Sequence, residues 1–147
     1  MASKQDILTF TPKVEEKFEV PKPKEYISAE QKMGGEPCAP KVYQYVYELL
    51  KRYNSEVAVS QQLVESFSQT ISRHIQCEQI LSETGFLAKH PTTGEPVTSP
   101  FVKMSLDYLK AANQIWDRIY AVVKDSNARG AVPSSKDMLD KLLRRAK

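Results

Sequence analysis

The side chains that carry most enzyme chemistry are few in this sequence. It contains two histidines, His74 and His90, and two cysteines, Cys38 and Cys77. His74 and Cys77 are three residues apart, a spacing that places both on one face of a helix and suits a pair of zinc ligands. No second pair of ligands accompanies them. We therefore predict no metal site and assign no catalytic residue.

Sequence motifs for common enzyme chemistry are also absent. The chain has no GxxxxGK, GxGxxG, GxSxG or HExxH pattern. Glu78 with Glu83, or Asp137 with Asp140, could be acidic pairs, but scattered carboxylates on helices are usually solvated. The sequence predicts a protein that is not an enzyme and has no cofactor. The alternative, an enzyme using His74, Cys77 or these carboxylates, would require a pocket with perturbed pKa values.

Basic residues are concentrated in the last third of the chain. Residues 101–147 contain ten Lys and Arg against five Asp and Glu, whereas residues 1–100 contain eleven against thirteen. Such a bias is typical of contact with a polyanion, but a solvated helix with mixed charges has the same composition. Both interpretations stay open at this point.

The element that must organise these residues is a long helix over residues 99–125. Ser99 can cap its first N–H groups and Pro100 suits the first helical position. Ala111 and Ala112 would let another helix approach closely. The apolar stripe has helical spacing and consists of Phe101, Met104, Tyr108, Ala112, Ile115, Ile119 and Val122, widened by Leu109, Trp116, Tyr120 and Val123. A face this broad must pack against something.

A second long helix is expected over residues 55–83, capped by Asn54 or Ser55 and ended by Gly85. Its expected buried residues are Val57, Leu63, Val64, Phe67, Ile71, Ile75, Ile80 and Leu81. Its expected exterior is polar and mostly uncharged: Ser60, Gln61, Gln62, Ser66, Ser68, Gln69, Thr70 and Ser72. The sequence PTTG between this helix and the next predicts a small hairpin or a structured loop that reverses the chain, so the two long helices should be antiparallel.

Shorter elements complete an all-α prediction. Residues 40–53 form a first helix with Tyr43, Tyr45 and Tyr47, which suit either a core edge or stacking on nucleic acid. A last helix begins at Ser134 or Ser135 and has an apolar and a basic side. We divide the chain into a flexible or extended arm (1–40), a helical core and oligomerisation domain (41–126), and a linker with a basic C-terminal helix (127–147). The arm is either a disordered tail or a segment that orders against the body or another subunit.

The composition of the chain limits the cellular compartments in which we expect the protein. No run approaches the ~20 apolar residues of a membrane span, and the first residues lack the apolar core of a secretory signal. Two cysteines do not make a disulfide framework. We expect a reducing, cytoplasmic environment and no membrane partner.

The order of these parts resembles that of bacteriophage terminase small subunits. The resemblance covers about residues 41–140. It depends on Gly85 at the end of the second helix, on Pro100 at the start of the long helix that follows, and on the step Pro133-Ser134-Ser135-Lys136 after it. These are helical and turn patterns without a chemical signature.

The resemblance implies a non-catalytic subunit that forms a homo-oligomeric ring in the host cytoplasm. It would bind double-stranded viral DNA and hand it to the large ATPase and nuclease subunit of the terminase. A ring would multiply weak, salt-dependent phosphate contacts. The candidates for these contacts are Lys136, Lys141, Arg144, Arg145 and Lys147, then Lys41, Lys51 and Arg52.

The same resemblance gives the apolar stripe a use between subunits. The candidate interface residues are Phe101, Met104, Tyr108, Ile115, Trp116 and Ile119. The C-terminal helix would contact either DNA or the large subunit. The alternative function is an oligomeric helical adaptor or structural protein that does not bind DNA.

Overall fold

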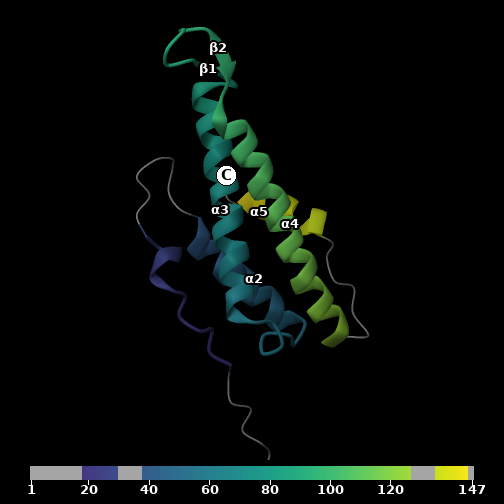
Figure 1. Ribbon diagram of the computed structural model, residues 1–147. Helices are drawn as coiled ribbons and strands as arrows, with labels where there is room; N and C mark the ends of the chain where they lie inside the picture. The colour runs from purple at the N-terminus through teal and green to yellow at the C-terminus, as the bar shows by residue number, and fades with distance from the viewer. Residues whose placement is uncertain (1–17, 30–37, 127–134, 146–147) are drawn as a thin grey trace, which may run out of the picture.

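The computed structural model describes residues 18–29, 38–126 and 135–145, and this part of the chain is mostly helical (Figure 1), as the sequence predicted. Its helices are η1 (Glu25–Ile27, a single 3-10 turn), α2 (Ala39–Arg52), α3 (Gln61–Thr84), α4 (Pro100–Ser126) and α5 (Ser135–Arg145). Two short strands, β1 (Leu87–Lys89) and β2 (Pro96–Thr98), separate α3 from α4.

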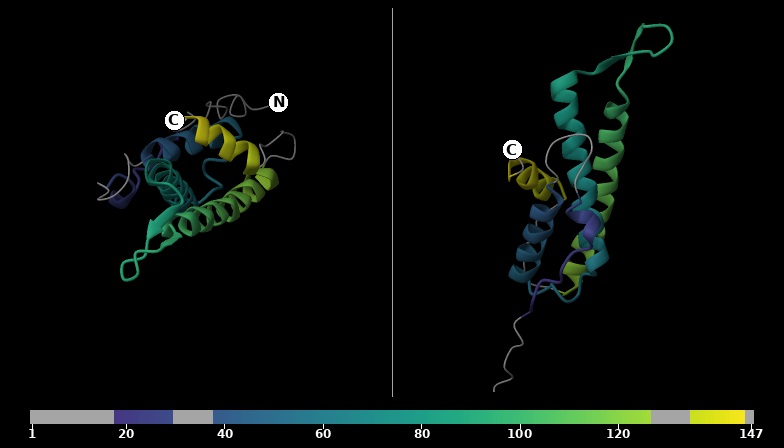
Figure 2. Two further views of the ribbon diagram at one scale, coloured as in Figure 1. Left: turned by 90° about the horizontal axis from the view of Figure 1, so that it is seen from above. Right: turned by 90° about the vertical axis from the view of Figure 1, so that its left-hand side faces the viewer.

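The two longest helices, α3 and α4, lie side by side, and the strand pair stands at their shared end (Figures 1 and 2). β1 and β2 pair antiparallel with Ala88 opposite Val97, which confirms the small hairpin predicted from PTTG. Gly85 ends α3 with φ 81° and ψ 176°, and its N–H donates to the carbonyl of Leu81 at 2.8 Å. Ser99 Oγ accepts a hydrogen bond from the N–H of Phe101 at 3.4 Å and so caps α4.

The start of α3 differs from the prediction. Ser60 Oγ, and not Asn54 or Ser55, accepts from the helix, bonding the N–H of Leu63 at 3.3 Å. Asn54 has φ 50°, the left-handed conformation that commonly ends a helix, and the N–H of Ser55 bonds back to the carbonyl of Leu50 at 2.9 Å. Residues 53–59 therefore close α2 and turn the chain. Val57, expected to be buried, lies on this turn and is 81% exposed.

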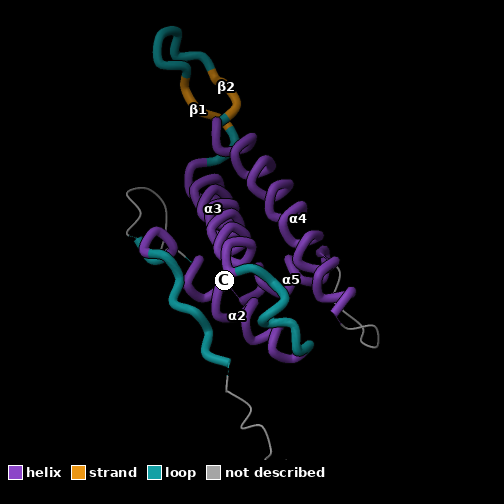
Figure 3. The backbone as a smooth tube through the Cα atoms, turned by 60° about the horizontal axis from the view of Figure 1, so that its bottom comes forward, coloured by secondary structure: helices purple, strands orange, loops and turns teal. Residues whose placement is uncertain are grey.

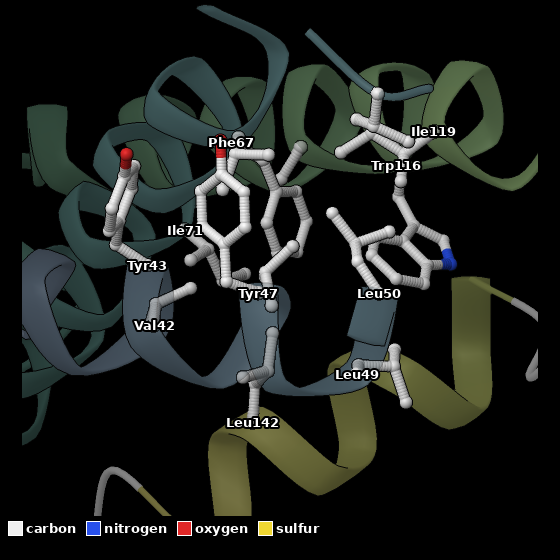
Figure 4. Packing of buried hydrophobic residues seen from close by; sticks show 14 of the residues in the cluster. Val42, Tyr43, Tyr47, Leu49, Leu50, Phe67, Ile71, Trp116, Ile119 and Leu142 are labelled. Atoms are coloured by element: carbon white, nitrogen blue, oxygen red, sulfur yellow. The ribbon is translucent and has the colours of Figure 1, made fainter. Parts of the chain in front are cut away.

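The hydrophobic core joins α2 to the half of the α3 and α4 pair that lies away from the strands (Figures 1 and 4). Phe67 of α3 and Trp116 of α4 meet at its centre, with ring centroids 5.3 Å apart. The residues of α4 that the chain buries are Ser105, Ala112, Trp116, Ile119 and Val123. Ala112 is fully buried, as expected for a small residue where helices approach closely.

Two residues assigned to the polar exterior of α3 are in fact buried. Ser68 Oγ donates to the carbonyl of Val64 at 2.7 Å. Ser72 Oγ accepts a hydrogen bond from the N–H of Cys38 at 3.1 Å, which gives a partner to the backbone N–H of the residue directly before α2. Each hydroxyl has a partner, which removes the cost of burying it. The uncharged polar surface is correspondingly smaller than predicted.

Part of the N-terminal arm is packed on the helical body (Figure 3). Phe18 stacks on Tyr47 with centroids 6.0 Å apart, and Tyr43 Oη donates to the carbonyl of Pro21 at 2.7 Å. The N–H of Lys24 donates to Glu65 Oε2 at 2.9 Å, and Ile27 is fully buried. For residues 18–29, which we call the strap, the structure favours ordering against the body over a disordered tail. The rest of the predicted arm, residues 1–17 and 30–37, lies outside the described residues, as does the linker 127–134.

None of the described helices combines the length and the apolar character needed to cross a bilayer.

Candidate nucleic-acid interface

The C-terminal helix α5 is held to the body by two leucines. Leu139 and Leu142 are 6% and 3% exposed and belong to the same core cluster as Val42 and Leu49 of α2. Figure 4 shows Leu142 below Val42 and Tyr47. Burying both leucines orients α5 on the body and leaves Lys141, Arg144 and Arg145 exposed.

This arrangement brings together two basic residues that are far apart in the sequence. The guanidinium carbon of Arg145 lies 4.2 Å from the ring centroid of Tyr45, a close cation–π contact. Lys41, one helical turn before Tyr45, lines the same pocket as Arg145. The first turn of α2 and the last turn of α5 therefore form one positively charged site.

The other candidate phosphate contacts are less concentrated. Lys141 and Arg144 are exposed on α5, and Arg52 is exposed at the far end of α2. Lys51 Nζ is 5.9 Å from the centroid of the Phe18 ring, so this ammonium group lies over the strap. The side chain of Lys136 and all of Lys147 lie outside the described residues.

The three tyrosines of α2 have different environments. Tyr43 and Tyr47 are buried in the core, with ring centroids 5.0 Å apart in an edge-on arrangement. Burial raises the pKa of both phenols, with the negative charge of Glu65 adding to the rise. Only Tyr45 is partly exposed, and Arg145 covers its ring. Of the three rings, those of Tyr43 and Tyr47 are therefore core residues, and only the Tyr45 ring is partly at the surface.

The candidate interface residues on α4 divide into two groups. Trp116 and Ile119 are 1% and 0% exposed, so their side chains pack inside the chain itself and are not on its surface. Phe101, Tyr108 and Ile115 are partly exposed, and Met104 is 39% exposed. The buried stripe is centred about one residue further along the helix than we expected, because α4 faces both α3 and the core around α2.

Several exposed apolar residues were not singled out from the sequence. Phe86, Leu87 and Val97 lie on or beside the strand pair, and Leu106 follows on the first turns of α4. With Met104 they form an exposed apolar set at the strand end of the molecule, which we call the apolar tip. An available signal was the apolar character of Phe86 and Leu87 directly after Gly85, in a segment too short to form a core.

The half of the α3 and α4 pair that is nearer the strands contains His74 and Cys77, the two residues weighed above as zinc ligands. His74 Nδ1 lies 2.9 Å from Ser105 Oγ and 3.0 Å from the carbonyl oxygen of Ser105. Because a carbonyl only accepts, Nδ1 carries the proton and donates, and Ser105 Oγ in turn donates to Glu78. The imidazole therefore does not take a proton from this hydroxyl through Nδ1.

Neither Ser105 nor Cys77 is presented to a substrate. Ser105 is 1% exposed and Cys77 is 5% exposed, and burial raises the pKa of the Cys77 thiol, with the charge of Glu78 adding to it. Within residues 18–29, 38–126 and 135–145, no group of three or more His, Cys, Asp and Glu side chains could hold a metal ion. The geometry of this cluster is that of a hydrogen-bonded link between helices.

Comparison with protein-family models, curated proteins and solved structures finds no match to this chain.

Proposed function

We propose that this protein is a DNA-binding packaging component of the terminase small-subunit type. In this role it binds double-stranded viral DNA, assembles as a homo-oligomeric ring in the host cytoplasm, and recruits or regulates the large ATPase and nuclease subunit. It catalyses no reaction itself. The long helices act as an antiparallel hairpin that packs beside its neighbours in the ring.

The proposal of DNA binding depends on the contact of α5 with α2. This contact places Arg145 of α5 beside the same pocket as Lys41 of α2, and Lys141 and Arg144 of α5 remain exposed. Individually weak phosphate contacts of this kind give affinity that falls with salt and depends little on sequence. A ring repeats the same basic surface in every subunit, which raises the total affinity without new contacts.

The observation that supports assembly is the apolar tip together with the partly exposed Phe101, Tyr108 and Ile115. Large apolar side chains exposed at one end of a molecule are more stable covered by another protein than in water. In this proposal a second copy of the chain covers them. The same set also supports the alternative function, an oligomeric adaptor that does not bind DNA.

DNA binding is tested with a triple variant, Lys141→Ala, Arg144→Ala and Arg145→Ala. Fluorescence anisotropy of a labelled duplex is measured between about 50 and 200 mM salt. We expect the triple variant to bind at least about tenfold more weakly, with a shallower salt dependence because fewer counterions are released. The matched control removes the same charge from exposed positions of α4: Lys103→Ala, Lys110→Ala and Lys124→Ala.

Equal losses in the two triple variants would show that net charge alone matters and would overturn the assigned surface. Failure of the unaltered protein to bind duplex DNA at low salt would favour the adaptor. Assembly is tested separately by native mass spectrometry. Leu106→Glu should lower the oligomer mass, whereas Val57→Glu, an equally polar change on an exposed turn away from the tip, should not. A monomeric unaltered protein would contradict the ring.

A further inference from the structure

A pocket opens between the first turns of α2 and the end of α5. It measures ≈ 210 Å³, and the described residues that line it are Cys38, Lys41, Val42, Tyr45, Leu142 and Arg145. A second hollow adjoins it and shares Lys41, Tyr45 and Arg145 with the first, adding Pro40, Gln44 and Glu48. The described residues that line the two hollows include no member of the hydrogen-bonded cluster around His74 and no residue of the apolar tip.

The inner part of the pocket is apolar and is held in place. Val42 and Leu142 are 4% and 3% exposed and belong to the core cluster, so the packing of the core fixes them. Tyr45 forms one wall, and the contact of its ring with Arg145 at 4.2 Å restrains both side chains. Such a wall favours a flat or aliphatic group that excludes water from the leucine and valine.

The outer part of the pocket is cationic. Lys41 and Arg145 provide an ammonium and a guanidinium group from two different helices, and the described lining residues of the first pocket include no Asp or Glu. Guanidinium and ammonium groups together bind carboxylate and phosphate oxygens through charge-assisted hydrogen bonds. Glu48 faces only the adjoining hollow, so an anion in the first pocket does not meet a carboxylate there.

The thiol of Cys38 adds no negative charge to the pocket. Burial raises its pKa, and this effect exceeds the opposing effects of the Ser72 hydrogen bond and of the charge of Lys41. The thiol is therefore protonated at neutral pH and is a polarisable, nearly apolar part of the wall. Cys38 also provides a chemical reporter, because it is one of the residues that line the pocket.

We propose that the pocket between α2 and α5 binds a small organic anion, whose flat or short apolar body lies against Val42, Tyr45 and Leu142 and whose carboxylate or phosphate group contacts Lys41 and Arg145. The size is suitable: a cavity of about 150 Å³ holds benzene in another protein, so ≈ 210 Å³ accommodates a ring with a head group. The DNA backbone alone would not use the apolar wall. The inference therefore goes beyond duplex binding and does not depend on it.

The test compares four probes of related shape. Phenyl phosphate and benzoate carry both a ring and an anion, benzyl alcohol carries the ring without charge, and inorganic phosphate carries the charge without a ring. Binding is measured from amide chemical shifts of residues 38–46 in the full chain. We expect saturable shifts with phenyl phosphate, benzoate or both, and at least about tenfold weaker binding of benzyl alcohol and inorganic phosphate.

Cys38 gives a second readout. In a Cys77→Ser protein, the rate of Cys38 alkylation by neutral iodoacetamide should fall when an aromatic anion is added, because the bound ring covers the thiol. Inorganic phosphate at the same concentration should leave this rate unchanged.

Two substitutions localise the anion. Arg145→Ala and Lys41→Ala should each weaken phenyl phosphate binding by about tenfold. Arg144→Ala and Lys51→Ala are matched controls, since they remove the same charge from the same helices without lining the pocket, and should change binding by less than about twofold. Lys41→Ala keeps the test valid if Arg145→Ala loosens α5.

Absence of saturable binding by either aromatic anion would overturn the inference. So would equal binding of all four probes, or equal losses in the Arg144 and Arg145 variants. None of these results bears on duplex DNA, whose binding is scored in the anisotropy experiment above.

Discussion

His74 Nδ1 donates to both the hydroxyl and the carbonyl oxygen of Ser105, at 2.9 and 3.0 Å, and thereby links α3 to α4. The same hydroxyl donates to Glu78, so three polar side chains link the two helices. Beside the buried Cys77 and Leu81, this half of the helix pair therefore has a polar link whose members satisfy one another.

Ser105→Ala should therefore destabilise the fold. The change removes the acceptor for His74 at Oγ and the donor for Glu78, which we expect to lower the free energy of unfolding by about 1–2 kcal/mol. Urea denaturation followed by circular dichroism measures this change. Ser82→Ala, on an exposed site of α3, should stay within about 0.5 kcal/mol. Equal effects of the two substitutions would contradict a stabilising role for the link.

Gly85→Ala should also destabilise the fold, although there is room for the new side chain. A Cβ at this position meets no atom within 4 Å, but φ 81° with ψ 176° is a region that is essentially restricted to glycine. We expect a loss of about 1–3 kcal/mol in the free energy of unfolding. Thr84→Ala, the neighbouring exposed residue, provides the comparison. An unchanged Gly85→Ala protein would show that the turn after α3 relaxes at no cost.

High pH should destabilise the protein through Tyr43 and Tyr47. Burial raises the pKa of both phenols above 10.0, so the folded state keeps protons that the unfolded state loses. The contribution of these two phenols to the free energy of unfolding is therefore fully present below pH 10.0, and it is lost as the pH rises above that value. Tyrosinate absorbance should show these phenols ionising late, together with unfolding. Tyr43→Phe should reduce the loss of stability above pH 10.0, and an unaltered pH dependence would contradict the assignment.

The strap should loosen when its buried acceptor is removed. Glu65 is 2% exposed and accepts from the N–H of Lys24, so Glu65→Ala leaves that N–H without its partner. We expect tryptic cleavage after Lys24 to become about fivefold faster or more, because a charge-assisted hydrogen bond is lost. Mass spectrometry of the digest identifies the cleavage site. Glu83→Ala, an exposed change on the same helix, should leave the rate unaltered; faster cleavage in both variants would contradict a specific role for Glu65.

The sequence predicted well what depends on neighbouring residues. Helical spacing and the stop at Gly85 located the end of α3, Ser99 and Pro100 located the start of α4, and PTTG located the strand pair. The start of α3 was misplaced because both Ser55 and Ser60 are good caps. The local backbone decides between them, since the N–H of Ser55 bonds back to the carbonyl of Leu50 and closes α2, while Ser60 Oγ caps α3.

What depends on contacts between distant residues was not predictable. Nothing in the spacing of residues 18–29 shows that Lys24 meets Glu65, 41 positions away. The burial of Ser72 likewise depends on the N–H of Cys38, 34 positions away, which donates to its hydroxyl. At the candidate site, the basic residues could be named from the sequence, but the pairing of Lys41 with Arg145 requires α5 to pack on α2.

The two long helices are stabilised unequally along their length. Around Trp116 they are part of a core shared with α2, whereas toward the strands they have mainly each other and the link between His74 and Ser105. Amide hydrogen exchange should therefore be slowest near Phe67 and Trp116 and should become faster toward Thr84 and Pro100. The strand end can open as a separate cooperative unit, at a free energy below that of global unfolding, while the rest of the protein stays folded.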